Sequence, residues 1–131
     1  MEIKETMQAI HQINLEKGFW EDKATRNVGE VLMLCVSELA EALEAHRKNR
    51  KADLPAYHNA IAALSPQEKL EAKAINTLFK NHIKDSFEDE IADTVIRLFD
   101  MSEAFGIDLE WHVQQKLAYN KSREHKHGKA Y

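Results

Sequence analysis

Hydrophobic residues recur at helical spacing along most of the chain, and this pattern predicts helices rather than strands. A first helix covers about residues 2–17 and ends at Gly18, a residue type that commonly terminates helices. A second helix begins after Asn27, whose side chain can cap it while Glu30 reaches back, and continues to about Lys48. Because its early turns are apolar on nearly every side, we expect it to be the central buried helix. Its main apolar stripe consists of Leu32, Val36, Leu39 and Leu43.

The middle of the chain is less regular. Residues 49–63 carry only a weak pattern, and we expect Pro55 to break any helix there. The motif Ser65-Pro66-Gln67-Glu68 is instead typical of a helix start, with a Ser cap, Pro at the first position and Glu at the third. We therefore predict one helix after this motif. Its apolar positions are Leu70, Ala74 and Leu78.

The last third of the chain predicts two more helices. Ser86 starts the first of them and Gly106 stops it. Asp108 caps a final helix that ends near Arg123, and residues 124–131 form a tail without a core pattern. With no strand pattern and no internal repeat, the sequence predicts a single all-α domain over residues 1–131.

Composition narrows the class of protein. The chain has 131 residues, 44% of them hydrophobic and 31% charged, which is typical of one helix-rich globular domain. Its net charge of -4 gives no reason to expect a nucleic acid polymer as a partner. No apolar run approaches the roughly 18 residues that a membrane span needs. Residues 1–5 lack the apolar core of a secretory signal, so we expect a cytoplasmic protein that does not bind membranes.

Two helices carry acidic residues that bear on function. Glu38 and Glu41 lie three positions apart and interrupt an otherwise apolar helix, where an ionised carboxylate without a partner would be costly to bury. The later helix carries four acids on one face: Asp89, Glu90, Asp93 and Asp100. A solvated polar face explains these four about as well as a site does. Two acidic pairs on separate helices nevertheless suggest a site for a hard cation, magnesium or manganese, which prefers oxygen ligands.

The last helix carries a basic face. Lys116, Asn120 and Arg123 recur at spacings of four and three, so they share one side of that helix. Cations near a helix C-terminus are also favoured by the helix dipole alone, and a solvated helix end is the simpler interpretation. Beside an acidic metal cluster, however, this face would supply the positive charge that a triphosphate needs.

These motifs, in this order, resemble a known family. Ser37-Glu38-Leu39-Ala40-Glu41 and Asp89-Glu90-Ile91-Ala92-Asp93 are similar to the E-E-x-x-E and E-x-x-D motifs of the MazG-like all-α nucleoside triphosphate pyrophosphohydrolases, which include dimeric dUTPases and dCTP pyrophosphatases. The stretch 116–123 looks like the last helix of that family. His11 and Trp20 resemble base-pocket positions of its dCTP-hydrolysing branch, and Arg97 sits where some relatives carry a Tyr near the sugar.

The resemblance implies a fold and an activity. It implies a four-helix MazG-like bundle, completed by a homodimer or a dimer of dimers, in which residues 49–84 are an insertion with an extra helix. It implies cleavage of a nucleoside triphosphate to a monophosphate and pyrophosphate with Mg²⁺, for which Mn²⁺ can substitute. The implied metal ligands are Glu38, Glu41, Glu90 and Asp93, with Glu38 or Glu41 also acting as general base. The implied substrate contacts are His11, Trp20, Arg97, Lys116, Asn120 and Arg123, and the implied base is a pyrimidine.

Other interpretations stay open at this point. A non-catalytic helical interaction module would explain the charged faces by solvation or assembly. A phosphoribosyl-ATP pyrophosphohydrolase would share the helices and acids without an aromatic base pocket. Trp20, in the loop after Gly18, is by residue type more often an anchor that packs on the core than a ligand contact. Its position in a loop at a helix end, with His11 facing out of the first helix beside it, nevertheless favours stacking on the base, and we predict that Trp20→Ala raises KM by one to two orders of magnitude.

Overall fold

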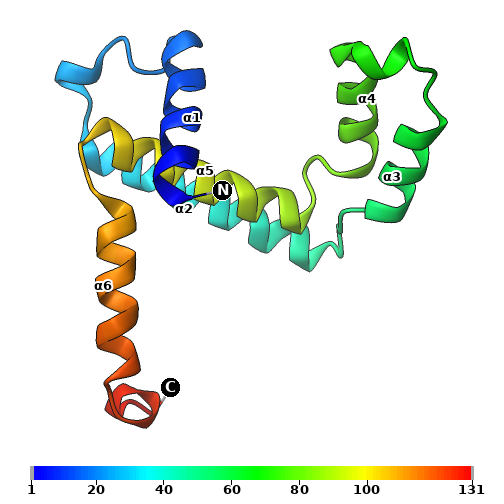
Figure 1. The fold of residues 1–131 in the computed structure, drawn as a ribbon. Coiled ribbons are helices and arrows are strands. Elements are labelled where there is room, and N and C mark those ends of the chain that lie inside the picture. The colour runs from blue at the N-terminus through cyan, green and yellow to red at the C-terminus, as the bar shows by residue number, and fades with distance from the viewer. Residues whose placement is uncertain (1, 131) are drawn as a thin grey trace. The chain divides into compact units, whose positions relative to one another are not determined.

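The computed structural model describes residues 2–130, and over that range it contains helices and turns but no strand (Figure 1). The all-α prediction is therefore confirmed, whereas the four-helix MazG-like bundle stays a prediction. The α-helices are α1 (Ile3–Glu16), α2 (Val28–Arg47), α3 (Leu54–Ala63), α4 (Ala72–His82), α5 (Phe87–Ala104) and α6 (Leu109–Lys121). The described residues also form three 3₁₀ turns: η1 (Lys23–Thr25) between α1 and α2, η2 (Glu68–Leu70) between α3 and α4, and η3 (His125–Gly128) after α6. None of these helices has an apolar stretch long enough to cross a bilayer.

The chain forms two compact units. The first contains the chain up to Arg26 and from Leu98 onward, and the second contains Asn27–Arg97, so the boundary falls inside α5. In the first unit, α1 contacts α6. As the sequence predicts, α1 is followed by Gly18 with a positive φ of 83°, and the Asp108 carboxylate caps α6 by accepting a hydrogen bond from the Trp111 backbone N–H.

The second unit is built on α2 and the first half of α5, which run antiparallel (Figure 1). The His46 ring, late in α2, lies 5.5 Å from the Phe87 ring at the start of α5, while Glu38, earlier in α2, pairs with Arg97 further along α5. The predicted start of α2 is confirmed, because the Asn27 side chain accepts a hydrogen bond from the Glu30 backbone N–H.

The side of α2 that is buried differs from the prediction. Its buried residues are Val31, Cys35, Glu38, Ala42 and Ala45, which recur at spacings of four and three. The predicted stripe has the same spacing one position later, so it is rotated by about 100° around the helix. Its four residues, Leu32, Val36, Leu39 and Leu43, are 45–50% exposed. The prediction that α2 is buried through its leucine stripe is thus wrong for a single chain, which buries the stripe of smaller side chains instead.

Residues 49–84 contain two α-helices rather than one. Pro55 lies in the first turn of α3, where a backbone N–H has no partner within the helix. A proline at this position therefore removes no hydrogen bond from the helix. Asp53 caps this helix by accepting from the Ala56 backbone N–H. The prediction that Pro55 prevents a helix here is therefore wrong, because its effect depends on its position within the turn.

The predicted capping motif before α4 does form. Ser65 Oγ accepts from the Glu68 backbone N–H at 3.1 Å, and Glu68 Oε1 accepts from the Ser65 backbone N–H at 3.0 Å. The motif starts only the short turn η2, however, because Glu71 is extended and separates η2 from α4. α4 then packs against α3 (Figure 1).

Candidate functional site

Three carboxylates meet in the second unit. Glu38 projects from α2, and Glu90 and Asp93 project from neighbouring turns of α5, three positions apart. Each offers an oxygen, and these oxygens all lie within 4.8 Å of one another. Glu38 and Glu90 are only 8% and 6% exposed, and Asp93 is half-buried. We call these three residues the carboxylate cluster. The four acids of α5 are not the solvated polar face that the sequence also allowed, because Glu90 and Asp100 are buried.

The cluster carries more negative charge than its surroundings offset. Burial is the largest of several causes that together raise the pKa of Glu90 to about 7; the others are the neighbouring Glu41, which also shares a hydrogen bond with it, and the charges of Asp93 and Glu38. The pKa of Asp93 is also raised, first by burial and then by Asp89 and Glu38. Carboxylates that resist ionisation in this way are stabilised by any cation that binds among them.

Arg97 forms a hydrogen bond with this cluster, and the charge of Lys84 also lowers the pKa of Asp93 in part. The Arg97 guanidinium donates a hydrogen bond from Nε to Glu38 Oε1, and it lowers the pKa of Asp93 in part. Glu41, the fourth predicted ligand, is exposed on α2 and lies beside Glu90. The structure therefore brings all four predicted ligands to one place, with three forming the cluster and Glu41 at its edge.

The donor set fits a hard divalent cation. All the ligand atoms are carboxylate oxygens, the type that Mg²⁺ and Mn²⁺ prefer, and two of the three acids are buried where water solvates them poorly. Among the residues that the structure describes, the carboxylate cluster is the group of acidic, Cys or His side chains close enough to share one metal ion.

His11 and Trp20 converge on an acid of the first unit, Asp100 of α5. The Trp20 indole N–H donates to Asp100 Oδ2 at 2.9 Å, and the Asn14 amide donates to the same oxygen at 2.8 Å. His11 Nδ1 lies 2.7 Å from Asp100 Oδ1. The expectation that His11 faces out of α1 is wrong, because its largely buried side chain points to this aspartate. The pairing partner Asp100 was missed as a buried residue, since on sequence it only extended an acidic face.

The Trp20 indole is closely surrounded. It is 7% exposed, with the rings of His11 and Phe105 edge-on at 5.7 and 5.8 Å between centroids. The Arg26 guanidinium lies 5.2 Å from the indole centroid. This is the environment expected of an anchor that packs on the core, and contact of Trp20 with a base stays a prediction.

The predicted basic face gathers around Tyr119 of α6. Lys116 Nζ and the Arg123 guanidinium lie 5.1 and 5.3 Å from the Tyr119 ring centroid. The buried Asn120 Oδ1 has no hydrogen-bond partner within residues 2–130. These residues belong to the first unit and the carboxylate cluster to the second, so a phosphate site shared between them stays a prediction.

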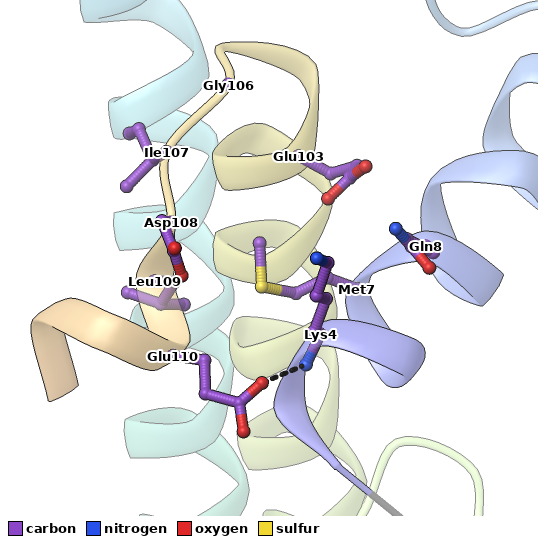
Figure 2. A pocket seen from close by; sticks show the side chains of 9 residues that line it. All are labelled: Lys4, Met7, Gln8, Glu103, Gly106, Ile107, Asp108, Leu109 and Glu110. Atoms are coloured by element: carbon purple, nitrogen blue, oxygen red, sulfur yellow. Dashed lines mark hydrogen bonds between the residues drawn. The ribbon is translucent and has the colours of Figure 1, made fainter. Parts of the chain in front are cut away.

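Each unit also has a hollow. In the first unit, a cavity of about 220 Å³ is bordered by α1 and the α5–α6 turn (Figure 2). Two of the three acids that line it serve the fold, because Glu110 accepts a hydrogen bond from the Lys4 backbone N–H at 3.2 Å and Asp108 caps α6. In the second unit, a larger and more apolar cavity of about 520 Å³ is bordered by residues of α3, α4 and α5, including Asp93 of the carboxylate cluster.

The candidate site consists of buried carboxylates with surplus negative charge, one arginine, and an apolar cavity that shares Asp93 with them. No family model matches this chain, and neither a curated protein nor a solved structure matches it.

Proposed function

We propose that this protein is a Mg²⁺-dependent nucleoside triphosphate pyrophosphohydrolase of the MazG-like all-α type, acting in the cytoplasm. Its products would be a nucleoside monophosphate and pyrophosphate, and Mn²⁺ would substitute for Mg²⁺. The observation that carries the proposal is the carboxylate cluster, because burying Glu38 and Glu90 next to Asp93 is unfavourable unless a cation joins them.

The residues at the cluster have distinct proposed roles. Glu38, Glu90 and Asp93 would hold the metal, which when bound supplies Lewis-acid stabilisation of phosphate oxygens and lowers the pKa of a bound water. Glu41 is exposed at the edge of the cluster, and this exposure supports a role for it as the general base that would accept the proton of the attacking water. The water oxygen bonds to the α-phosphorus, the bond from that phosphorus to the α–β bridging oxygen breaks, and pyrophosphate leaves.

Cationic residues would hold the remaining phosphate oxygens. Arg97 is the closest candidate, since its guanidinium is already at Glu38 and its side chain is 42% exposed. If Glu38 held a metal ion, the Arg97 guanidinium would be free to bind a phosphate oxygen instead. Lys116, Asn120 and Arg123 are proposed to contact phosphate or sugar, on the basis of the family resemblance.

We further propose that the enzyme works as a homodimer or a dimer of dimers. The support is the exposed stripe on α2, whose four large apolar side chains recur at the spacing of a helix–helix seam. A second copy that packs on this stripe would remove it from water. The exposed stripe equally suits a non-catalytic interaction module, which differs from the enzyme in lacking any response to Mg²⁺.

The test is a screen of ribo- and deoxyribonucleoside triphosphates with Mg²⁺, detecting pyrophosphate. Glu41→Gln and Asp93→Asn should each lower kcat by about 100-fold or more, the range for loss of a general base or a metal ligand, with helicity unchanged. Glu30→Gln, an exposed acid in the first turn of the same α2 helix as Glu41, is the control and should stay active. If both site variants stay fully active, or no triphosphate is cleaved, the proposal is wrong.

A further inference from the structure

The apolar cavity of the second unit lies next to the carboxylate cluster. Its apolar wall comes from both sides: Leu54 of α3 with Phe79 and Ile83 at the end of α4, and Ala92 and Ile96 of α5. Its volume of about 520 Å³ falls within the usual range for small-molecule sites. Segment 49–84 therefore supplies one wall of a cavity whose other wall is the helix that carries two of the cluster's acids.

Most charged groups at this cavity already have partners. Glu88 accepts a hydrogen bond from the Ala52 backbone N–H at 2.9 Å, and Asp89 accepts one from the Asp85 backbone N–H at 2.9 Å. Lys84 pairs with Asp85. Asp93 differs from them because it belongs to the carboxylate cluster as well as to the cavity wall. The cavity thus joins an apolar compartment to the candidate cation site through one shared residue.

We propose that this cavity binds the base and sugar of the nucleoside triphosphate whose phosphates lie at the carboxylate cluster, an inference that rests on the proposed function. The charges argue for this occupant. Acidic groups border the cavity, so its interior suits an uncharged, flat group, whereas anionic phosphates are held only where a cation offsets the carboxylates. Phe79, 38% exposed, offers a ring on which a base can stack.

The proposal assigns a role to residues that the family resemblance treats only as an insertion. It also accounts for base binding without Trp20, whose indole is already enclosed by His11, Phe105 and Arg26. A nucleoside in this cavity would contact Phe79 of α4 and pass Asp93, so that its 5′ end points to the carboxylate cluster.

Two variants change the cavity in opposite ways. Phe79→Ala removes the aromatic wall, and Ala92→Leu fills the space from an exposed position of α5 with a good helix former. Leu70→Ala is the matched control, because Leu70 lies in the same inserted segment but is 88% exposed and does not line the cavity. All three should keep the helical circular dichroism of the parent protein.

Binding is measured by calorimetry on the full chain with Mg²⁺, using two probes. One is an α,β-imido nucleoside triphosphate of the base preferred in the screen, which resists cleavage at that bond, and the other is inorganic triphosphate. Phe79→Ala and Ala92→Leu should each weaken binding of the imido nucleotide by about tenfold, within the range for loss of one stacked base. Binding of inorganic triphosphate should stay unchanged, and Leu70→Ala should match the parent with both probes.

The outcomes separate this inference from the proposed function. If the parent protein binds both probes and the two cavity variants bind the imido nucleotide as tightly as the parent, the cavity assignment is wrong while the proposed function stands. If the parent binds neither probe with Mg²⁺, the proposed function fails and the cavity assignment fails with it. Equally weakened binding of both probes also overturns the assignment, because it indicates a structural role for the two residues. A change in the molecular mass of the particle without a change in affinity overturns it as well, because it indicates that a second copy of the chain binds at the cavity.

Discussion

Replacing Glu90 by Gln should stabilise the metal-free protein at alkaline pH and leave its stability at acidic pH nearly unchanged. The reason is that Glu90 has a folded-state pKa of about 7, raised from an ordinary value of 4.5 by burial and by Glu41. A raised pKa means that the folded state holds the proton more tightly than the unfolded state does. The stability that this proton gives is fully present below about pH 4.5 and is lost as the pH rises through about 7.

The size of the effect follows from that pKa difference. The pKa of Glu90 is about 7 in the folded state and 4.5 in the unfolded state. This difference corresponds to about 3 kcal/mol of folding stability, which is lost as the pH rises from 4.5 to well above 7. Gln resembles the protonated carboxyl group and does not ionise, so Glu90→Gln should recover most of this at pH 8. For a chain of this length, about 3 kcal/mol is expected to raise Tm by about 10 °C.

The assay is thermal unfolding followed by circular dichroism in EDTA at pH 5 and pH 8. Glu88→Gln is the matched control, because Glu88 lies on the same helix but has its pKa lowered, chiefly by the hydrogen bond from the Ala52 backbone N–H. That substitution should give no stabilisation at pH 8. Millimolar Mg²⁺ at pH 8 should raise the Tm of the parent more than that of Glu90→Gln. Identical Tm values for parent and Glu90→Gln at pH 8 in EDTA would refute the crowding of charge at this site.

Two further predictions concern assembly and Trp20. Light scattering at micromolar concentration should give at least a dimer, and Leu39→Glu, in the exposed stripe of α2, should give a monomer with unchanged helicity; a parent protein that is monomeric and active would contradict this. Trp20→Ala should lower the stability by about 3–5 kcal/mol, because it empties a buried site and removes a donor to Asp100, with KM unchanged. A KM raised by one to two orders of magnitude at unchanged Tm would instead place Trp20 against the base.

The sequence predicts those features that depend on near neighbours in the chain. Asn27 caps α2 through the N–H of Glu30, and Asp108 caps α6 through that of Trp111, because a capping bond needs only two or three intervening residues. The E-x-x-D pair on α5 is also local, since three positions on a helix place two side chains together whatever the fold. The two acidic pairs on separate helices already suggest that Glu38 meets Glu90 and Asp93, and the family resemblance adds which acids are the ligands.

Features that depend on distant parts of the chain could not be predicted in this way. α2 has two stripes of identical spacing, and nothing local tells which one α5 covers; the bulkier leucines were the natural choice, yet the smaller side chains are buried. Trp20 and Asp100 are 80 positions apart, so their hydrogen bond has no sequence signal of its own. The orientation of His11 toward the protein interior has no sequence signal either, because its partner Asp100 lies 89 positions away.

The two groups of buried acids in this protein can be distinguished by what surrounds them. Asp100 is paired with His11 and accepts hydrogen bonds from Asn14 and Trp20, so both of its carboxylate oxygens have partners and it holds α1 and the following loop to α5. Glu90 is equally buried, but its nearest charged neighbours are Glu41 and the other acids of the cluster, which oppose its ionisation. The first arrangement stabilises the fold by itself. The second is unfavourable by itself unless a ligand supplies the missing positive charge, which is why the function proposed above is centred on Glu90 and not on Asp100.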